Sequence, residues 1–432
     1  MQRSFIHLAT AALILVSLAA CTDHRDLLAP TKPNAMITGG PIGGGGGVIQ
    51  IPRATDLIEI SAGGSHSCVR RRDGLILCWG LNTKFQVGVP TTAYCAGAAV
   101  YLPGTLPCVT VATAVPLLTS AGTGPAVGAA HVTLGNTHSC ALDTLKTAWC
   151  WGDNSSGQVG TGAAFYGQYP LPVTGANNNL TFVSLGAGGD ATCGSSNIGG
   201  GLMCWGRSPG AASTKSTPTF VAAGTFSTVV VTTDHGCVNG FTNGQWDCWG
   251  SNASGQLGVS PASLASSAPF FTVHAMDNAT SIAVANGVTC NDEPNGGSSQ
   301  CFGTNLISST VGLLGNPQDM APFDFVPQIA GPFHGVSIGV NHGCALDALN
   351  AAWCWGIGTK GQLGGGSYQS STAPVMVQGG LTFRSLSVGT DFSCGIAIDN
   401  HAYCWGDNYY GQLGNGGWSF LGATAPVRVS GL

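Results

Sequence analysis

The chain has 432 residues, a net charge of −5, and charged side chains at only 8% of its positions, against about 25% in an ordinary soluble domain. Its few basic residues are scattered apart from the short run Arg70–Arg72, which argues against a nucleic-acid-binding surface. Because 44% of the residues are hydrophobic, the 67 glycines indicate tight turns in a folded protein and not disorder.

Residues 1–20 have the features of a signal peptide. Arg3 precedes an apolar stretch from Leu8 to Leu18, which is shorter than the roughly 20 residues that span a bilayer. The segment ends in Leu-Ala-Ala-Cys at 18–21, which resembles the lipobox of bacterial lipoproteins. That resemblance implies cleavage before Cys21 and a lipid on its side chain. Thr22 stands where the inner-membrane retention signal has Asp, which favours the outer membrane. An ordinary secretory signal is the alternative.

Residues 21–47 are expected to form a tether between the membrane and the folded part. Pro30, Pro33, Pro41 and the glycine run 43–47 cannot build a hydrophobic core. We therefore place one folded domain at residues 48–432.

Cysteine pairs recur along this domain, with the second cysteine ten or eleven positions after the first, and Trp-Gly usually follows the second cysteine. The chain has 17 cysteines, so an even number remains when Cys21 is set aside as the lipidation site. An even number of cysteines in an exported chain indicates disulfides. Zinc sites need closer Cys and His clusters, so we expect no metal and no cofactor. The repeated pairs are Cys68/Cys78, Cys140/Cys150, Cys193/Cys204, Cys237/Cys248, Cys290/Cys301, Cys344/Cys354 and Cys394/Cys404. Cys95 and Cys108 remain as further disulfide candidates, and whether they pair with each other is left open.

Each cysteine pair fits a β-hairpin. In the second repeat, two short apolar runs flank the polar turn 143–147, which places Cys140 opposite Cys150 at a distance that a disulfide can bridge. A short apolar strand precedes each hairpin, with a proline-led strand ahead of it, and a glycine-rich turn usually follows the hairpin. Four strands in each of seven repeats predict an all-β, seven-bladed β-propeller with four-stranded blades.

The ends of the chain must close this ring. The proline-led strand 426–429 follows the seventh hairpin, so we predict that it completes blade one beside residues 57–61. Closure of this kind would remove exposed strand edges. Residues 48–51 are the alternative source of the closing strand.

The repeat reads as an apolar strand, Gly, His-Ser, a second apolar strand, Trp-Gly-x-Asn and Gly-Gln-Leu-Gly. This order resembles the repeat of the regulator of chromosome condensation family over nearly all of the mature chain. The stapling cysteines and the lipobox look like an exported bacterial branch. The resemblance implies the propeller fold and, as an alternative function, guanine-nucleotide exchange on a small GTPase. An exported, disulfide-rich chain lies where GTP is scarce, which argues against that activity.

Four histidines precede the first hairpin cysteine by two residues, at His66, His138, His235 and His342. The remaining repeats have Ala191, Val288 and Phe392 there, so we interpret these histidines as buried and structural. The sequence contains no nucleophile elbow, P-loop or metalloprotease motif. We predict no catalytic residues, and an envelope enzyme with a site between blades is the second alternative.

Function is expected in loops that depart from the repeat, because loops on a rigid scaffold commonly carry binding residues. One such departure is an insertion at about 90–130. Aromatic side chains are favoured interface anchors, although they could instead pack over neighbouring blades. The candidates are Tyr94, Tyr101, Phe165, Tyr166, Tyr169, Tyr409, Tyr410 and Trp418, with Phe420 beside the last. We expect a monomeric, non-enzymatic scaffold that binds an envelope or extracellular protein or a polysaccharide.

Overall fold

The computed structural model forms one compact unit over Pro52–Leu432. It describes residues 53–95, 106–117, 128–162, 166–174, 180–197, 200–211, 213–240, 244–262, 264, 266–272, 279–285, 287–292, 299–304, 306–308, 311–312 and 333–432. The leader and tether with Cys21, the residues 48–51, and the candidates Tyr101 and Phe165 lie outside this part. Among the described residues, no helix has the length and apolar character needed to cross a membrane.

The first four blades are antiparallel sheets, each built from consecutive strands. Blade one contains β1 (Leu57–Ala62), β2 (His66–Arg71), β3 (Ile76–Leu81), β5 (Leu106–Val115) and the short β4 (Tyr94–Cys95) at its edge. Blade two contains β6 (Ala129–Leu134), β7 (His138–Asp143), β8 (Ala148–Gly152) and β9 (Gly167–Pro172). Blade three contains β10 (Phe182–Gly188), β11 (Ala191–Ser196), β12 (Gly201–Gly206) and β13 (Lys215–Ala222). Blade four contains β14 (Phe226–Val231), β15 (His235–Gly240), β16 (Trp246–Ser251) and β17 (Ser266–Thr272).

The remaining three blades continue this order. Blade five has three paired strands within the described residues, β18 (Ser281–Ala285), β19 (Val288–Asp292) and β20 (Gln300–Gly303), followed by a separate pair, β21 (Leu306–Ser308) and β22 (Val311–Gly312). Blade six contains β23 (His334–Ile338), β24 (His342–Leu346), β25 (Ala352–Gly356) and β26 (Ser371–Met376). Blade seven contains β27 (Phe383–Val388), β28 (Phe392–Ala397), β29 (Ala402–Asn408) and β30 (Ser419–Arg428).

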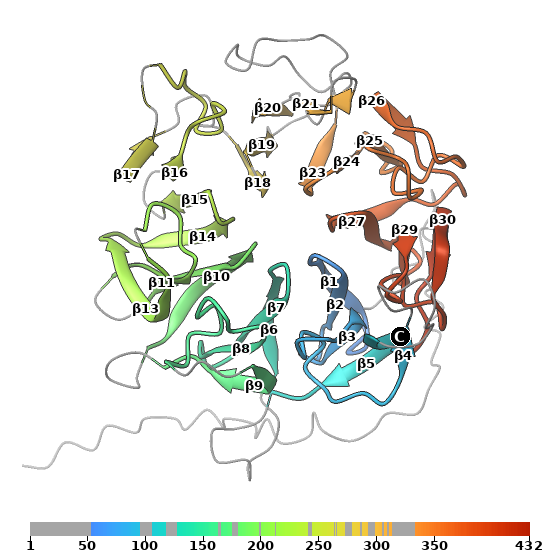
Figure 1. Cartoon of the computed structure of the whole chain (residues 1–432), viewed down its shortest axis with the longest axis horizontal. Coiled ribbons are helices and arrows are strands. Elements are labelled where there is room, and N and C mark those ends of the chain that lie inside the picture. The colour runs from blue at the N-terminus through green and yellow to red at the C-terminus, as the bar shows by residue number, and fades with distance from the viewer. Residues whose placement is uncertain are drawn as a thin grey trace, which may run out of the picture. The chain divides into compact units, whose positions relative to one another are not determined.

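The first strands of the seven blades surround the centre of the ring (Figure 1). These first strands are β1, β6, β10, β14, β18, β23 and β27. Each contacts the first strand of the next blade, and the contact of β27 with β1 closes the ring. The predicted all-β, seven-bladed propeller is confirmed.

The seven predicted hairpin disulfides are all present, one in each blade. The two cysteines of each hairpin face each other across its second and third strands, with Cα atoms 4.0–4.1 Å apart. In chain order the bonded pairs are Cys68 with Cys78, Cys140 with Cys150, Cys193 with Cys204, Cys237 with Cys248, Cys290 with Cys301, Cys344 with Cys354, and Cys394 with Cys404. Each bond staples two strands of one blade, so other contacts must hold the blades together.

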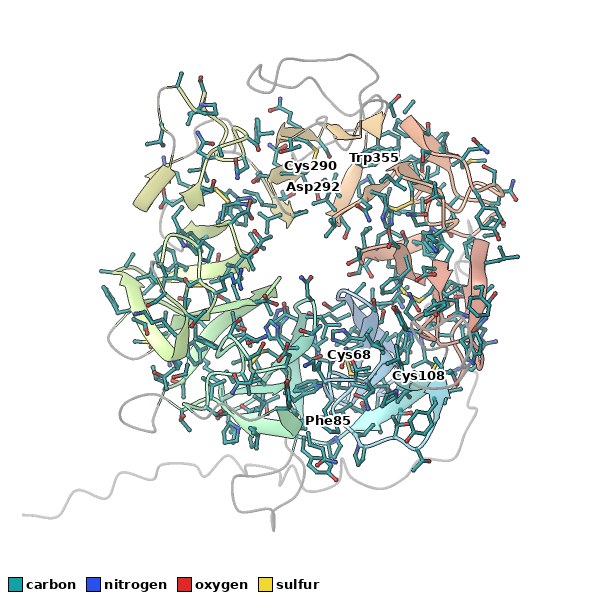
Figure 2. All side chains as sticks on the ribbon, viewed as in Figure 1. Cys68, Phe85, Cys108, Cys290, Asp292 and Trp355 are labelled. Carbon is teal, nitrogen blue, oxygen red and sulfur yellow. A yellow bond between two sulfur atoms is a disulfide. The ribbon has the colours of Figure 1, made fainter. Side chains whose placement is uncertain are left out.

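The pairing of Cys95 with Cys108, which the sequence left open, is also present. These two cysteines form an eighth disulfide with a Cα–Cα distance of 5.7 Å, which ties β4 to β5. Figure 2 shows Cys68 and Cys108 in the same blade, on β2 and β5. Blade one is therefore the one blade with two disulfides among the described residues.

The prediction that the C-terminal strand completes blade one is wrong. Strand β30 pairs with β29, with Val427 opposite Cys404, and therefore forms the outer edge of blade seven. In blade one the strand beside β3 is β5, which pairs Thr113 with Cys78. The predicted insertion thus contains the missing strand. Strand β5 follows β3 after a short connection, so pairing these two strands closes a much shorter loop than pairing β3 with the chain end. The shorter loop costs less conformational entropy.

The ring closes instead through contacts between two complete blades. The Ala112 N–H of blade one donates to Ser430 O at 2.9 Å, and Gly416 N–H of blade seven donates to Thr110 O at 2.8 Å. The Trp79 indole N–H adds a bond of 2.9 Å to Gln412 O. The C-terminal residues therefore join blades seven and one without adding a strand to blade one.

Candidate functional site

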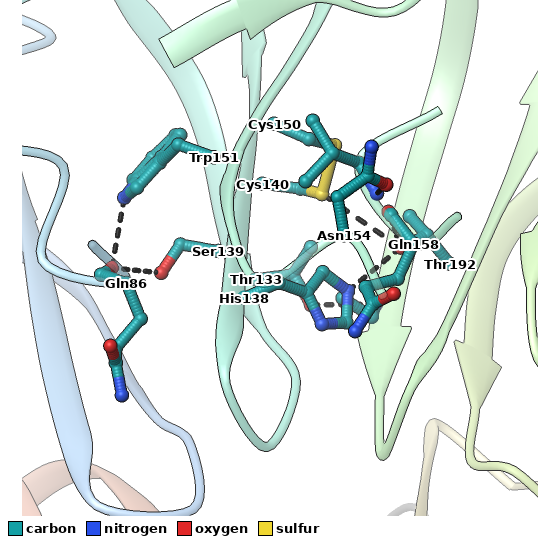
Figure 3. Close-up of a disulfide and its surroundings, with 12 residues drawn as sticks. Gln86, Thr133, His138, Ser139, Cys140, Cys150, Trp151, Asn154, Gln158 and Thr192 are labelled. Carbon is teal, nitrogen blue, oxygen red and sulfur yellow. Dashed lines mark hydrogen bonds between the residues drawn. A yellow bond between two sulfur atoms is a disulfide. The ribbon is translucent and has the colours of Figure 1, made fainter. Parts of the chain in front are cut away.

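The repeated histidines fasten four of the seven blades to the blade that follows. His66 Nε2 lies 2.8 Å from Ser139 Oγ in blade two, and that hydroxyl donates to Gln86 O in blade one at 2.7 Å. Figure 3 shows the next copy, in which His138 lies beside Thr192 while Gln158 supplies the carbonyl. The remaining copies are His235–Thr289–Gln256 and His342–Ser393–Gln362. We call each such trio an interblade clasp.

Burial determines the charge of these imidazoles. All four side chains are fully buried. Desolvation lowers the pKa of His66 and of His342 to about 3, and that of His138 to about 4. These three rings are therefore neutral near pH 7. Because each partner hydroxyl donates its one hydrogen to a glutamine carbonyl, the Nε2–H of the ring donates to that hydroxyl. The predicted burial of the four histidines is confirmed.

The Trp-Gly and Gly-Gln-Leu-Gly motifs meet at the same blade junctions. The last glycine of the turn packs against the buried tryptophan of the next blade, and a Cβ on Gly88 or Gly414 would come within 2.7 Å of the indole of Trp151 or Trp79. In four of these turns, the side-chain oxygen of an asparagine accepts a backbone N–H from five residues later, as Asn82 Oδ1 does from Val87 at 3.1 Å. The repeat motif therefore serves to join blades, which leaves binding to the residues outside it.

A cavity of about 550 Å³ lies at the centre of the ring, bordered by the first strands of all seven blades. Its lining consists mainly of backbone, small side chains and hydroxyls, and His131 is the one ionisable residue among the lining residues. His131 Nδ1 lies 2.5 Å from Glu59, and Nε2 lies 3.0 Å from Leu185 O. Burial opposes its protonation, but Glu59 outweighs that effect and raises the pKa of His131. In the described part of the chain, no three His, Cys, Asp or Glu side chains gather to hold a metal.

Strand direction gives the propeller two different ends. In each blade with four described strands, the turn between the first and second strands and the connection between the third and fourth strands lie at one end. The hairpin turns between the second and third strands lie at the other end. All the described aromatic candidates except Tyr169, which lies within β9, belong to connections between third and fourth strands or to their borders. The sequence candidates therefore gather at one end of the ring.

Four aromatic rings form a cluster in blade seven, where β29 connects to β30. Ring centroids are 4.9 Å apart for Tyr409 and Tyr410, and 5.3 Å apart for both Tyr409–Phe420 and Trp418–Phe420, all in edge-to-face contact. Phe420 is 61% exposed. These rings support one another and leave apolar surface in contact with solvent, which is unusual for packing alone.

Tyr94 lies next to this cluster along the ring. It is 54% exposed and precedes Cys95, whose disulfide with Cys108 ties β4 to β5. Gly411, one residue after Tyr410, approaches both Thr110 and Cys95: a Cβ at Gly411 would lie 3.5 Å from Cys95 Sγ. The disulfide of blade one therefore supports the turn that carries Tyr409 and Tyr410.

Two further contacts extend the aromatic surface to the neighbouring blades. Lys84 Nζ of blade one donates to Tyr166 OH of blade two at 2.8 Å and lies 4.4 Å from the centroid of that ring. Tyr368 OH of blade six donates to Leu421 O of blade seven at 3.0 Å. Sequence reasoning missed Tyr368, although it follows a glycine turn as Phe165 does. We name Tyr94, Tyr166, Tyr368, Tyr409, Tyr410, Trp418 and Phe420 the aromatic face.

Comparison with known proteins agrees with this architecture. Residues 57–86, 129–158 and 383–412 match the regulator of chromosome condensation (RCC1) repeat. Human WBSCR16 superposes with a TM-score of 0.64 at 15% identity, covering 82% of this chain and 94% of its own. Prp20p from Saccharomyces cerevisiae has a TM-score of 0.62 at 16% identity, covering 88% and 87%. The chain is thus similar to RCC1-type propellers in three repeats and in fold.

Proposed function

We propose that this protein is a non-enzymatic scaffold that binds a protein or glycan partner at the bacterial cell envelope, held there by a lipid on Cys21. The observation that carries the proposal is the aromatic face, where exposed rings from blades six, seven, one and two lie on one end of a rigid ring. Partly exposed aromatic side chains on a fixed support are favoured anchors for a partner.

The rest of the molecule supports binding over chemistry. Eight disulfides fit an oxidising compartment outside the cytoplasm. The four repeated histidines, the candidates that the sequence offered as acids or bases, are buried in interblade clasps. What the described structure offers a partner is therefore surface shape and aromatic contact area.

Partner capture tests this proposal. The mature chain would be crosslinked in envelope extract and also passed over immobilised envelope polysaccharide, beside the variants Tyr409→Ser/Phe420→Ser and Met376→Ser. Met376 is exposed on the outer strand β26, away from the aromatic rings, and serves as the matched control. We expect the double variant to retain at most a tenth of the captured partner, because central aromatic anchors contribute about 2 kcal/mol or more. Equal capture by the double variant would contradict the aromatic face as the site.

Nucleotide exchange is not part of the proposal. Prp20p from yeast has binding properties toward Gsp1p and histones. At 16% identity, the similarity of Prp20p to this chain supports a shared fold and does not support a shared activity.

A further inference from the structure

The opposite end of the propeller is formed by the hairpin turns between second and third strands. Three of these turns present an aliphatic side chain to solvent: Leu145 in blade two is 70% exposed, Leu349 in blade six 78%, and Ile398 in blade seven 57%. A single exposed leucine needs no explanation. Three at the tips of equivalent turns on one end of the ring form a pattern.

These turns share one backbone geometry, in which Leu145 and Leu349 occupy the same position and Ile398 stands one position earlier. Asp143 and Asp347 each bond to the residue four positions later, and their carboxylates accept N–H bonds within the turn. Lys146, Asn350 and Asn400 all have φ between 63° and 67°. Leu145 and Leu349 therefore occupy the same position at the tip of their turns. Hydrogen bonds within each turn, and not packing of the leucine side chain, hold the turn in this conformation.

The turns of neighbouring blades are linked around this end of the ring. Phe383 N–H of blade seven donates to Asn350 O of blade six at 2.8 Å, and Leu57 N–H of blade one donates to Asn400 Oδ1 of blade seven at 3.1 Å. Ala129 N–H of blade two donates to Gly74 O of blade one at 2.9 Å. The tips of blades six, seven, one and two therefore form a continuous arc.

Basic side chains accompany the aliphatic tips in this arc. Arg53, Arg72 and Arg384 are exposed, and so is Lys146, which follows Leu145 directly. Asp56 lies 4.0 Å from Arg72 and offsets part of its charge. The Arg384 guanidinium donates to two uncharged oxygens, Leu57 O and Asn400 Oδ1. Aliphatic and basic side chains thus lie together along the arc, beside the carboxylates of Asp73, which pairs with Arg71, and of Asp399, which accepts a hydrogen bond from Tyr403.

The chain also enters the propeller at this end. Residues 54 and 56 bond to the hairpin turn of blade one through Asp73 N–H to Ala54 O at 2.9 Å and Arg72 N–H to Asp56 O at 2.8 Å. Cys21 lies 32 residues before Arg53, so the two residues are at most about 110 Å apart, the reach of a fully extended chain of that length. A lipid on Cys21 would therefore hold the bilayer within reach of the arc.

We infer that this hairpin face, defined by Arg53, Arg72, Leu145, Lys146, Leu349 and Ile398, rests on an anionic lipid surface. Aliphatic tips enter the boundary between headgroups and acyl chains, while arginine and lysine bind lipid phosphates. This inference rests on the lipid anchor of the proposed function. Its consequence is that the aromatic face, at the other end of the ring, points away from the membrane and toward a partner.

Vesicle sedimentation tests the inference. The mature chain with Cys21→Ser, which cannot carry a lipid, is mixed with vesicles of phosphatidylethanolamine and phosphatidylglycerol, or with neutral phosphatidylcholine vesicles. We expect binding to the anionic vesicles only, weakened at least tenfold by Leu145→Ser/Leu349→Ser/Ile398→Ser. Arg53→Gln/Arg72→Gln should weaken it more than tenfold, since each basic residue contributes about fivefold at low salt.

The matched control is Phe420→Ser/Leu421→Ser, which removes two exposed apolar side chains from the other end of the ring and should bind like the parent chain. If the triple variant has a lowered melting temperature, Leu349→Ser alone replaces it, since that side chain is the most exposed of the three. No binding by the parent chain, or equal loss in the control, would overturn the inference. Labelling Cys21 with radioactive palmitate tests the anchor separately, so failure of the anchor and failure of membrane docking are distinguishable.

Discussion

At the scale of single residues, the clasp histidines show how an identical motif can be structural in every copy. His66, His138 and His342 have their pKa lowered by burial, and each bonds to a hydroxyl of the next blade. Their replacement by Ala, Val and Phe in other repeats predicted a structural role. The partner hydroxyls could not be predicted, because they belong to a different repeat, about 50 or more residues away.

These histidines make stability depend on pH. Each is neutral in the folded state down to a pKa of about 3 or 4 but protonates near 6.5 when unfolded, so protons bind the unfolded chain more tightly between these values. The contribution of these histidines to the free energy of unfolding is fully present above pH 6.5. It falls as the pH drops toward 4, by about 1.4 kcal/mol per pH unit for each histidine.

Melting temperatures between pH 8 and pH 4 measure this effect. We expect the steepest fall below pH 6.5 in the parent chain and a smaller slope in His66→Gln/His138→Gln/His342→Gln. Glutamine keeps a neutral hydrogen-bonding group but cannot take up the proton. The same slope in both proteins would contradict the account.

The glycine at the end of the Gly-Gln-Leu-Gly turn allows a close approach between blades. Gly414→Ala places a methyl group 2.7 Å from the Trp79 ring at φ 63°, whereas Gly416→Ala introduces one at φ 95° with no atom within 4 Å. Both substitutions carry backbone strain of about 1 kcal/mol, but only the first adds a clash, for a total of about 3 kcal/mol. Urea unfolding with the disulfides intact compares them. Equal losses in the free energy of unfolding for the two variants would mean that Gly414 does not pack tightly against Trp79.

At the scale of strands, local pairing could be predicted from the sequence and long-range pairing could not. The cysteine spacing identifies every hairpin and its disulfide, because both partners lie within one repeat. The outer strand of blade one was assigned to residues 426–429, since β5 lies in a segment without the proline-led pattern of the other blades. Its alternating Val109, Val111 and Val115 are the signal that could have identified it.

The corrected strand order has a measurable consequence. Deleting residues 424–432 removes half of β30, including the partners of Tyr403 and Cys404 in β29 of blade seven. Hydrogen exchange would then be faster at residues 403–404, while β1 at residues 57–62 stays protected by its pairing with β2. Faster exchange in β1, with β29 unchanged, would restore the original prediction.

At the scale of the whole molecule, the ring separates two kinds of surface. Clasps and tryptophan contacts occupy the junctions between blades, and the hairpin disulfides lie within the blades, so the repeat motif leaves the two ends of the ring free to carry other residues. Composition and repeats predicted a rigid exported propeller and several of its exposed aromatic side chains. The predicted closure of the ring implies that Tyr94 and Tyr409 lie in adjacent blades, but the sequence could not show that Gly411 approaches the Cys95–Cys108 disulfide, because these residues belong to different repeats.

The most direct test of this two-faced scaffold is partner capture by three chains in parallel: the mature protein, Tyr409→Ser/Phe420→Ser, and Leu349→Ser/Ile398→Ser. The account predicts that the aromatic variant loses the partner and that the hairpin variant keeps it. Loss of the partner only in the hairpin variant, or its retention by all three chains, would contradict the central claim that the aromatic face is the binding surface.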